Sequence, residues 1–194
     1  IVACGTAYHA GFVGKYYIEK LARIPVEVDI ASEFRYRSPI LDESTLTIVI
    51  SQSGETSDTL AALKEAKRLG SKTMAITNVV GSSIAREADQ VVYTWAGPEI
   101  AVASTKAYTT QLITVFMLAT YMAGLKETIS ADYAKSLISS LRKVPAQISE
   151  ILEDVEPIKT FAQQYGFNED VFFIGRSLDY AVALEGSLKL KEIS

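Results

Sequence analysis

Short apolar runs alternate with helical segments through the first half of this 194-residue chain, and this alternation restricts the fold more than any other feature. Runs with the pattern of strands occupy residues 1–4, 26–30, 46–50, 72–77 and 90–94. Strands that alternate with helices at this spacing form a parallel sheet with helices on both faces. We therefore expect an α/β protein, a three-layer α/β/α sandwich around a mainly parallel, five-stranded sheet.

The second half of the chain is mostly helical. A helix predicted over residues 105–125 is apolar nearly all round, which is typical of a helix buried in a large domain or against a second subunit. Its apolar run is interrupted by Lys106 and several threonines and is too short to span a bilayer. Three amphipathic helices, a last strand over residues 171–175 and a closing helix from about Asp179 follow. Because no repeat or low-complexity linker interrupts the chain, we expect one domain over residues 1–194.

The composition excludes several classes of function. Hydrophobic residues make up 48% and charged residues 22% of the chain, which is ordinary for a globular protein. A net charge of −4 and the lack of a basic run argue against nucleic acid or an anionic membrane as a partner. The single cysteine, Cys4, allows no intrachain disulfide and fits a cytoplasmic location. The presence of only one histidine, His9, argues against a histidine-based zinc site. We interpret Cys4 and His9 as structural residues.

Both ends of the chain have the pattern of an excised domain. The chain begins in a strand-like run at Ile1, with neither an initiator methionine nor a signal peptide. It stops at Ser194 inside a predicted helix. We therefore expect a longer parent protein, with part of its function outside this sequence.

A serine-rich loop connects the strand predicted at residues 46–50 to a helix that begins near Asp58. The loop consists of Ser51, Gln52, Ser53, Gly54, Glu55 and Thr56. Free N–H groups and the positive end of the helix dipole make such a position an anion site, and the hydroxyl groups could surround a phosphate without a metal. The loop lacks the Gly-Lys-Ser/Thr of a nucleotide P-loop and the three glycines of a dinucleotide turn, which favours a small phosphorylated molecule. A capped loop, in which Ser53 or Thr56 satisfies the first helical N–H groups, fits the local pattern equally well.

Two further stretches follow strands and are expected at the same edge of the sheet. Residues 5–7 form a turn after the first strand, and their N–H groups could reach the same ligand. Residues 102–106 follow the fifth strand and open the long apolar helix. Ser104 in this second stretch is either a helix N-cap or a ligand contact.

Three charged residues in the closing helix share one face. Glu185, Lys189 and Glu192 are spaced i, i+4 and i+7. A lysine between two carboxylates is suited to moving a proton next to a carbonyl carbon. The same pattern also occurs as solvated ion pairs on surface helices. Leu184, Leu188 and two small neighbouring residues indicate close packing here.

These stretches together resemble the isomerase domain of the glutamine–fructose-6-phosphate aminotransferases. The matching motifs are CGT at residues 4–6, IASEFRYR at 30–37, SQSGET at 51–56, VASTKA at 102–107 and ALEGSLKLKEIS at 183–194. The serine-rich loop alone would indicate only the wider sugar isomerase (SIS) superfamily. The IASEFRYR and LKEIS motifs narrow the resemblance to these enzymes.

The resemblance implies an enzyme that joins ammonia from glutamine to fructose 6-phosphate and isomerises the product to glucosamine 6-phosphate. It implies a homodimer in the cytoplasm and no cofactor or metal. The residues that it assigns to the phosphate are Ser51, Gln52, Ser53 and Thr56, and those that it assigns to the sugar are Thr6, Val102 and Ser104. Glu192 matches the base that moves a proton between C1 and C2, supported by Lys189 and Glu185.

The sequence departs from the family pattern in two ways. Ala7 stands where the family commonly has a phosphate-binding serine, and one missing hydrogen bond costs about 1 kcal/mol. The chain also lacks the glutaminase domain and the second SIS subdomain, which supplies the ring-opening histidine and the tail lysine for the imine. We expect this first subdomain to bind sugar phosphate weakly or not at all alone, and to be inactive.

Two other functions share the fold. A non-catalytic sugar-phosphate sensor needs the phosphate loop but has no use for the carboxylate pair Glu185 and Glu192. The chain could also belong to another phosphosugar isomerase, but the IASEFRYR motif at residues 30–37 argues against this function.

Overall fold

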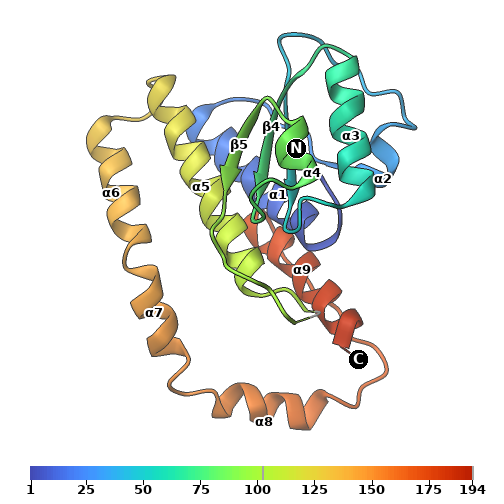
Figure 1. The fold of residues 1–194 in the computed structure, drawn as a ribbon. Coiled ribbons are helices and arrows are strands. Elements are labelled where there is room, and N and C mark those ends of the chain that lie inside the picture. The colour runs from blue at the N-terminus through green and yellow to red at the C-terminus, as the bar shows by residue number, and fades with distance from the viewer. Residues whose placement is uncertain (102, 194) are drawn as a thin grey trace.

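The computed structural model describes residues 1–101 and 103–193, and a five-stranded parallel sheet lies at its centre (Figure 1). The strands are β1 (Val2–Ala3), β2 (Asp29–Ile30), β3 (Leu46–Ser51), β4 (Lys72–Thr77) and β5 (Gln90–Tyr93). Their order across the sheet is β2-β1-β3-β4-β5, and every neighbouring pair is parallel. The predicted fold class is confirmed.

The central strands β3 and β4 are largely buried because both faces of the sheet are covered. They pair along their full length, from Leu46 opposite Lys72 to Ser51 opposite Thr77. Val49, Ile50, Ala75 and Ile76 are fully buried. Alternate residues point to opposite faces, so each strand contributes to two separate cores.

Nine α-helices surround the sheet within the described residues. They are α1 (Gly5–Tyr17), α2 (Ala31–Phe34), α3 (Ser57–Arg68), α4 (Ser83–Glu87), α5 (Lys106–Leu125), α6 (Ala131–Leu141), α7 (Val144–Ile151), α8 (Glu156–Tyr165) and α9 (Leu178–Ile193), and a π-helical turn, η1 (Ile18–Ala22), extends α1. Helices α2, α3 and α4 pack on the face that contains Val49 and Ala75. Helices α1, α5 and α9 pack on the face that contains Ile50 and Ile76, which completes the three layers.

The arrangement places the beginnings of two helices differently from the sequence prediction. Residues 5–7 form the first turn of α1 rather than a separate turn before it. The sequence also predicts a short helix that begins at Ser32, whereas α2 begins at Ala31 with Ile30 as its N-cap. Both differences move a helix boundary by a few residues and leave the order of the elements unchanged.

Residues 131–177, here called the arm, leave the compact part of the molecule and return to it at α9 (Figure 1). No described residue of α6, α7 or α8 is buried. Residues 171–175 form no strand and pair with no described strand, so the prediction of a sixth strand there is wrong for this chain. A strand needs a neighbour to bond its N–H and C=O groups, and the arm offers none.

The long helix α5 is only partly buried. Ala107, Gln111, Val115, Ala119, Thr120 and Ala123 face the core. Met117 and Tyr121 are exposed on the opposite side. None of the described helices has the length and apolar character that crossing a membrane requires.

Candidate functional site

The serine-rich loop lies between β3 and α3, at the carboxyl end of the central strand, and is held in one shape by its own hydrogen bonds. Gly54 has φ +66°, and a Cβ there would overlap the side chain of Ser82. The Ser51 hydroxyl accepts the Gly54 N–H at 3.0 Å and pairs with the Thr56 hydroxyl at 3.0 Å. Only glycine fits this left-handed, closely packed position.

Neighbouring elements fix the loop from outside. The carbonyl of Gln52 accepts the Asn78 N–H at 3.2 Å, next to the end of β4. The Glu55 carboxylate accepts the Ser83 N–H at 2.7 Å, and hydrogen bonding from Ser83 lowers the pKa of Glu55. The loop is therefore organised without any ligand.

The N-terminus of α3 has no side-chain cap. Thr56 is its N-cap residue but makes no capping hydrogen bond, and the Ser53 hydroxyl instead accepts the Glu55 N–H at 3.2 Å. Among the described residues, no side chain accepts from the N–H groups of the first turn of α3. These groups and the helix dipole face the loop, which is the arrangement that binds anions. The capped-loop alternative, in which Ser53 or Thr56 satisfies these groups, does not match this geometry.

A cavity of about 260 Å³ opens beside the loop at the carboxyl edge of the sheet. Its lining brings together Thr6 and Ala7 of α1, Ser51, Gln52, Ser53 and Thr56 of the loop, and Ser104 near the start of α5. Six of the seven predicted ligand-binding residues therefore line one cavity. The seventh, Val102, lies outside the described residues.

Ser104 does not act as a helix cap. The N-cap of α5 is Thr105, and its side chain makes no capping bond. The Glu99 carboxylate accepts the Ala107 N–H at 3.0 Å and fills that role. Ser104 therefore stays in the cavity wall, and Glu99 is a cavity residue that the sequence prediction missed.

Two more polar residues in the cavity wall were not predicted. Gln111 is only 3% exposed, and its amide oxygen has no hydrogen-bond partner among the described residues. The Thr59 hydroxyl on α3 is likewise buried and unpartnered there. A buried glutamine in an otherwise apolar helix is the sequence signal that identifies Gln111.

The predicted charged stripe of α9 joins this cavity through Thr6. Glu185 is 5% exposed, and its carboxylate accepts the Thr6 hydroxyl at 3.0 Å. The ammonium group of Lys189 lies 3.4 Å from Glu185 and contacts the carboxylate of Glu192. The three predicted catalytic residues therefore form one connected group, which runs from the buried Glu185 to the exposed Glu192.

The negative charges of Glu185 and Glu192 raise the pKa of nearby side chains. Partial burial opposes the charge on Lys189, but Glu192 and Glu185 outweigh it and raise its pKa. Burial, and then the charge of Glu185, raise the pKa of Tyr108 on α5 to about 12. The Tyr108 hydroxyl is buried without a described partner. A neutral tyrosine thus lies near the acidic end of the group.

His9 has a partner that the sequence did not indicate. Its Nδ1 lies 2.7 Å from the Glu185 carboxylate, although 176 residues separate the two. The interpretation of His9 as merely structural rested on the lack of a partner at triad spacing. Only the packing of α1 against α9 brings this partner into reach.

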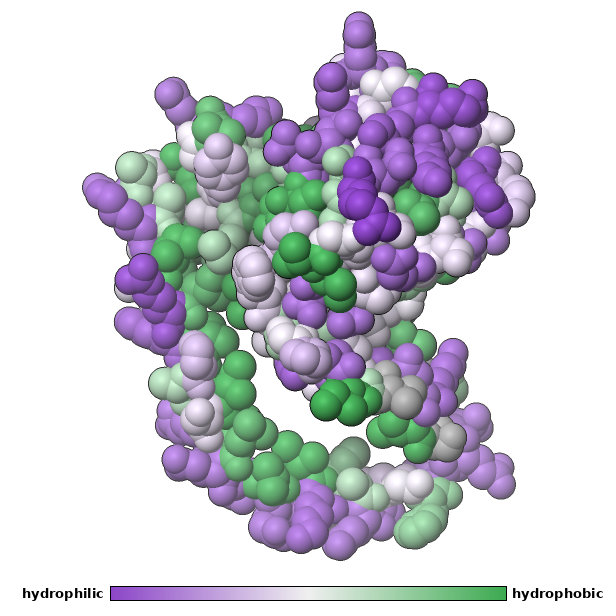
Figure 2. Space-filling model, in the orientation of Figure 1, coloured by the Kyte–Doolittle hydropathy of each residue, from purple (hydrophilic) through white to green (hydrophobic). Residues whose placement is uncertain are grey.

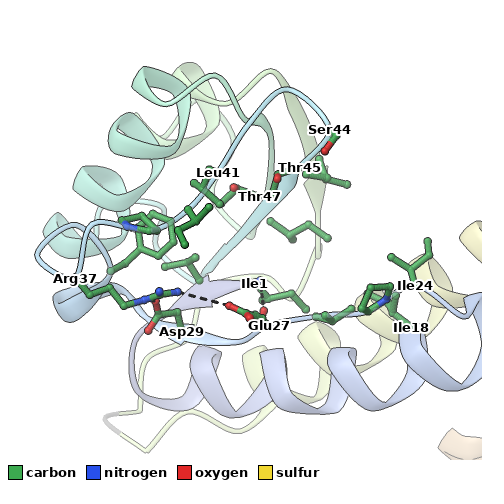
Figure 3. A pocket seen from close by; sticks show the side chains of 18 of the residues that line it. Ile1, Ile18, Ile24, Glu27, Asp29, Arg37, Leu41, Ser44, Thr45 and Thr47 are labelled. Carbon is green, nitrogen blue, oxygen red and sulfur yellow. Dashed lines mark hydrogen bonds and ion pairs between the residues drawn. The ribbon is translucent and has the colours of Figure 1, made fainter.

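A larger cavity, of about 640 Å³, lies at the opposite edge of the sheet (Figure 3). Ile1, Asp29 and Thr45 line it at the amino ends of β1, β2 and β3, and Arg37 forms an ion pair with Glu27 across it. Ligands of open parallel sheets bind outside the carboxyl ends of the strands. The smaller cavity beside the serine-rich loop is therefore the candidate site.

Comparisons with known proteins indicate the family of the chain. The model of the SIS domain family matches residues 1–121. The chain is 67% identical over all 194 residues to a glutamine–fructose-6-phosphate aminotransferase of Caldanaerobacter subterraneus and 64% identical to that of Clostridium tetani. It spans 32% of the length of each of these relatives.

Solved structures give the same result. The C-terminal domain of a glucosamine-fructose-6-phosphate aminotransferase from Francisella tularensis superposes with a TM-score of 0.95 at 42% identity, over 99% of this chain and 55% of that one. A glucosamine-6-phosphate deaminase from Thermotoga maritima superposes with a TM-score of 0.77 at 25% identity, over 100% of this chain and 57% of that one. The serine-rich loop, the parallel sheet and the matching family model lead to one conclusion: the chain belongs to the SIS domain family.

Proposed function

We propose that this chain is the phosphosugar-binding part of the isomerase half of a glutamine-dependent enzyme that converts fructose 6-phosphate to glucosamine 6-phosphate in the cytoplasm. The observation that supports the proposal most is the position of Thr6. Its side chain lines the cavity of the serine-rich loop and also bonds Glu185 of α9. This position of Thr6 supports a phosphate site and a proton-transfer group that act on the same ligand.

In this proposal the loop binds the phosphate of a hexose. Ser51, Ser53 and Thr56 offer hydroxyl groups, Gln52 offers an amide, and the uncapped start of α3 offers N–H groups. Thr6 and Ser104 contact the sugar from the other wall, and the resemblance adds Val102. Binding energy from the phosphate, remote from the reacting carbons, holds those carbons in register with the base.

Glu192 is the proposed base. It takes a proton from one of the adjacent carbons C1 and C2 and returns it to the other, which needs a carboxylate within reach of both. Lys189 contacts the carboxylate of Glu192, while Glu185 holds Lys189 from its other side. A sensor would need the phosphate cavity but not this group, which favours the enzyme over a non-catalytic SIS domain.

The partners in this proposal are the glutaminase domain, the second SIS subdomain and a second copy of the chain. The exposed apolar residues of the arm and of α5 are surfaces that such partners would cover. The 194-residue chain alone should not form glucosamine 6-phosphate from fructose 6-phosphate and ammonia. Measurable turnover by the chain alone would show that the missing parts are not needed.

Thermal unfolding of the full-length protein that carries this sequence tests the phosphate site. Fructose 6-phosphate should raise its melting temperature, because a ligand that binds only the folded state stabilises it. Ser53→Ala should abolish this shift. Ser130→Ala removes a serine that caps α6 in the arm and should leave the shift unchanged. An equal shift in wild type and Ser53→Ala would refute the phosphate role.

A further inference from the structure

We propose that His9 is a positioning residue for Glu185, Lys189 and Glu192 of α9, here called the α9 group. Together with Thr6, His9 holds the Glu185 carboxylate. Through Glu185 it fixes the position of Lys189 beside Glu192. The inference rests on the proposed function, because it gives His9 a task in the same proton transfer. It adds a residue from the opposite end of the chain to a group that the sequence placed entirely on one helix.

Two side chains of α1 hold the two oxygens of Glu185 separately. The Thr6 hydroxyl donates to Oε1 at 3.0 Å, and His9 Nδ1 lies 2.7 Å from Oε2. Thr6 and His9 are spaced i and i+3, so both lie on the face of α1 that packs against α9. Contacts to both oxygens fix the plane of the carboxylate as well as its position.

Burial makes these contacts necessary. The side chain of Glu185 is 6% exposed and that of His9 is 12% exposed. A buried carboxylate is costly unless hydrogen bonds and a countercharge compensate it. An ionised carboxylate only accepts hydrogen bonds, so Nδ1 must carry a proton to bond it. His9 therefore supplies a donor at a position where water has little access.

The position of Lys189 follows from that of Glu185. Its ammonium group lies 3.4 Å from Glu185 and contacts Glu192, so the same ammonium is shared between the two carboxylates. If Glu185 rotated away from α1, the countercharge would shift and the geometry at Glu192 would change with it. The hydroxyl of the nearby Tyr108 on α5 makes no hydrogen bond to Glu185, because it has no partner among the described residues.

The test uses the full-length protein that carries this sequence and measures glucosamine 6-phosphate formation with saturating and limiting fructose 6-phosphate. His9→Ala should lower kcat about 10- to 100-fold, as misplacement of a catalytic group does, while KM changes far less. The ligand-induced rise in melting temperature should remain. His9→Asn should recover most of kcat, because its amide N–H can take the place of Nδ1–H.

A matched control separates positioning from stability. Val13→Ala removes a buried side chain one turn further along α1 and away from Glu185, so it should lower the melting temperature without lowering kcat. If His9→Ala fails to fold, His9→Leu gives the same test, because it fills the space without a donor.

The outcomes are distinguishable. A variant lacking the donor that keeps wild-type kcat, or a His9→Asn variant no better than His9→Ala, would overturn the role of His9 and leave the proposed function standing. A wild-type protein that binds no fructose 6-phosphate and forms no product would overturn the proposed function, and the role of His9 with it.

Discussion

Helix α3, within residues 1–125, and helices α6, α7 and α8, within residues 131–193, have similar amphipathic patterns but very different packing. In the first region, α3 and α5 bury apolar residues against the sheet, and the loop at residues 51–56 is fixed by neighbouring strands. In the second region, α6, α7 and α8 bury none of their described residues. The difference teaches that an amphipathic pattern predicts a helix with a face to cover, but does not say what covers it.

The apolar residues of the arm gather along its inner side and face the open space beside the compact part (Figure 2). The exposed large hydrophobic residues of the arm are Tyr133, Ile148, Ile151, Leu152, Val155, Ile158, Phe161, Tyr165, Phe167, Val171, Phe172, Phe173 and Ile174. Such a surface exceeds what a monomer usually exposes, so it indicates an interface. The family model ends at residue 121, so a single domain over residues 1–194 stays a prediction.

Helix α9 is the exception within the second region, because it returns to pack on α1. If this helix does chemistry, Glu192→Gln in the full-length protein should lower glucosamine 6-phosphate formation about 10²- to 10⁴-fold, the usual range for a lost general base. Binding of fructose 6-phosphate, measured by the melting-temperature shift, should stay nearly intact. A variant with near-wild-type turnover would remove Glu192 as the base.

A pair of truncations tests the difference in packing between the two regions. In the 194-residue chain, Ile76→Ala should lower the free energy of unfolding by about 2–5 kcal/mol, because Ile76 is fully buried in β4. Phe161→Ala should have little effect, since this arm residue is 64% exposed. Chemical denaturation measures both.

The same two variants, Ile76→Ala and Phe161→Ala, also test the difference between the two regions in the full-length protein. If a partner covers the arm there, Phe161→Ala should become destabilising and approach the cost of a core truncation. A Phe161→Ala variant as neutral in the full-length protein as in the chain alone would show that the arm stays uncovered.

Asp89 tests a polar contact of the sheet region. Its carboxylate accepts the Thr73 N–H at 2.9 Å and the Thr73 hydroxyl at 2.7 Å, and these bonds lower its pKa. A lowered folded-state pKa gives stability that is present above the unfolded value of about 3.9 and lost as pH falls through the folded value. Because Asp89 is 42% exposed, we expect Asp89→Asn to cost only about 1 kcal/mol at neutral pH.

The pH dependence supplies the control for Asp89. The difference in unfolding free energy between wild type and Asp89→Asn should shrink as pH falls below about 4, because the wild-type carboxylate then becomes protonated. Asp170→Asn in the exposed arm should change stability at no pH. A pH-independent cost of Asp89→Asn would contradict the role of the ionised carboxylate.

The smallest expected effect concerns Ala7 in the cavity wall. Ala7→Ser restores the hydroxyl that the family commonly has there and should strengthen fructose 6-phosphate binding by about 1 kcal/mol, or roughly fivefold. Titration of the full-length protein measures the change. Unchanged affinity would show that the loop and the start of α3 already satisfy the phosphate.

Most of the fold could be predicted because its signals are local. The strands β3, β4 and β5 and the length of α5 follow from apolar runs and turn residues within a few positions. The wrong element, the strand at residues 171–175, has equally good local signals. It lacks a neighbouring strand, and no local signal reports on that.

The candidate site was predictable in part for the same reason. Ser51, Ser53 and Thr56 share one loop, and Glu185, Lys189 and Glu192 share one helix, so their grouping is visible in the sequence. Glu99 as the cap of α5 and Gln111 in the cavity wall were missed, because their roles depend on what lies opposite them.

The sequence by itself determined the α/β class, the strand order along the chain, the serine-rich loop and the charged stripe of α9. These depend on hydrophobic period and on residue types at fixed short spacings. Only the tertiary structure decided that Ser104 is not a cap, that Thr6 connects the cavity to Glu185, and that His9 meets Glu185 from 176 residues away. Such contacts arise when α1 and α9 pack on the same face of the sheet. The hydrophobic periodicity of a segment does not indicate which distant segment it packs against.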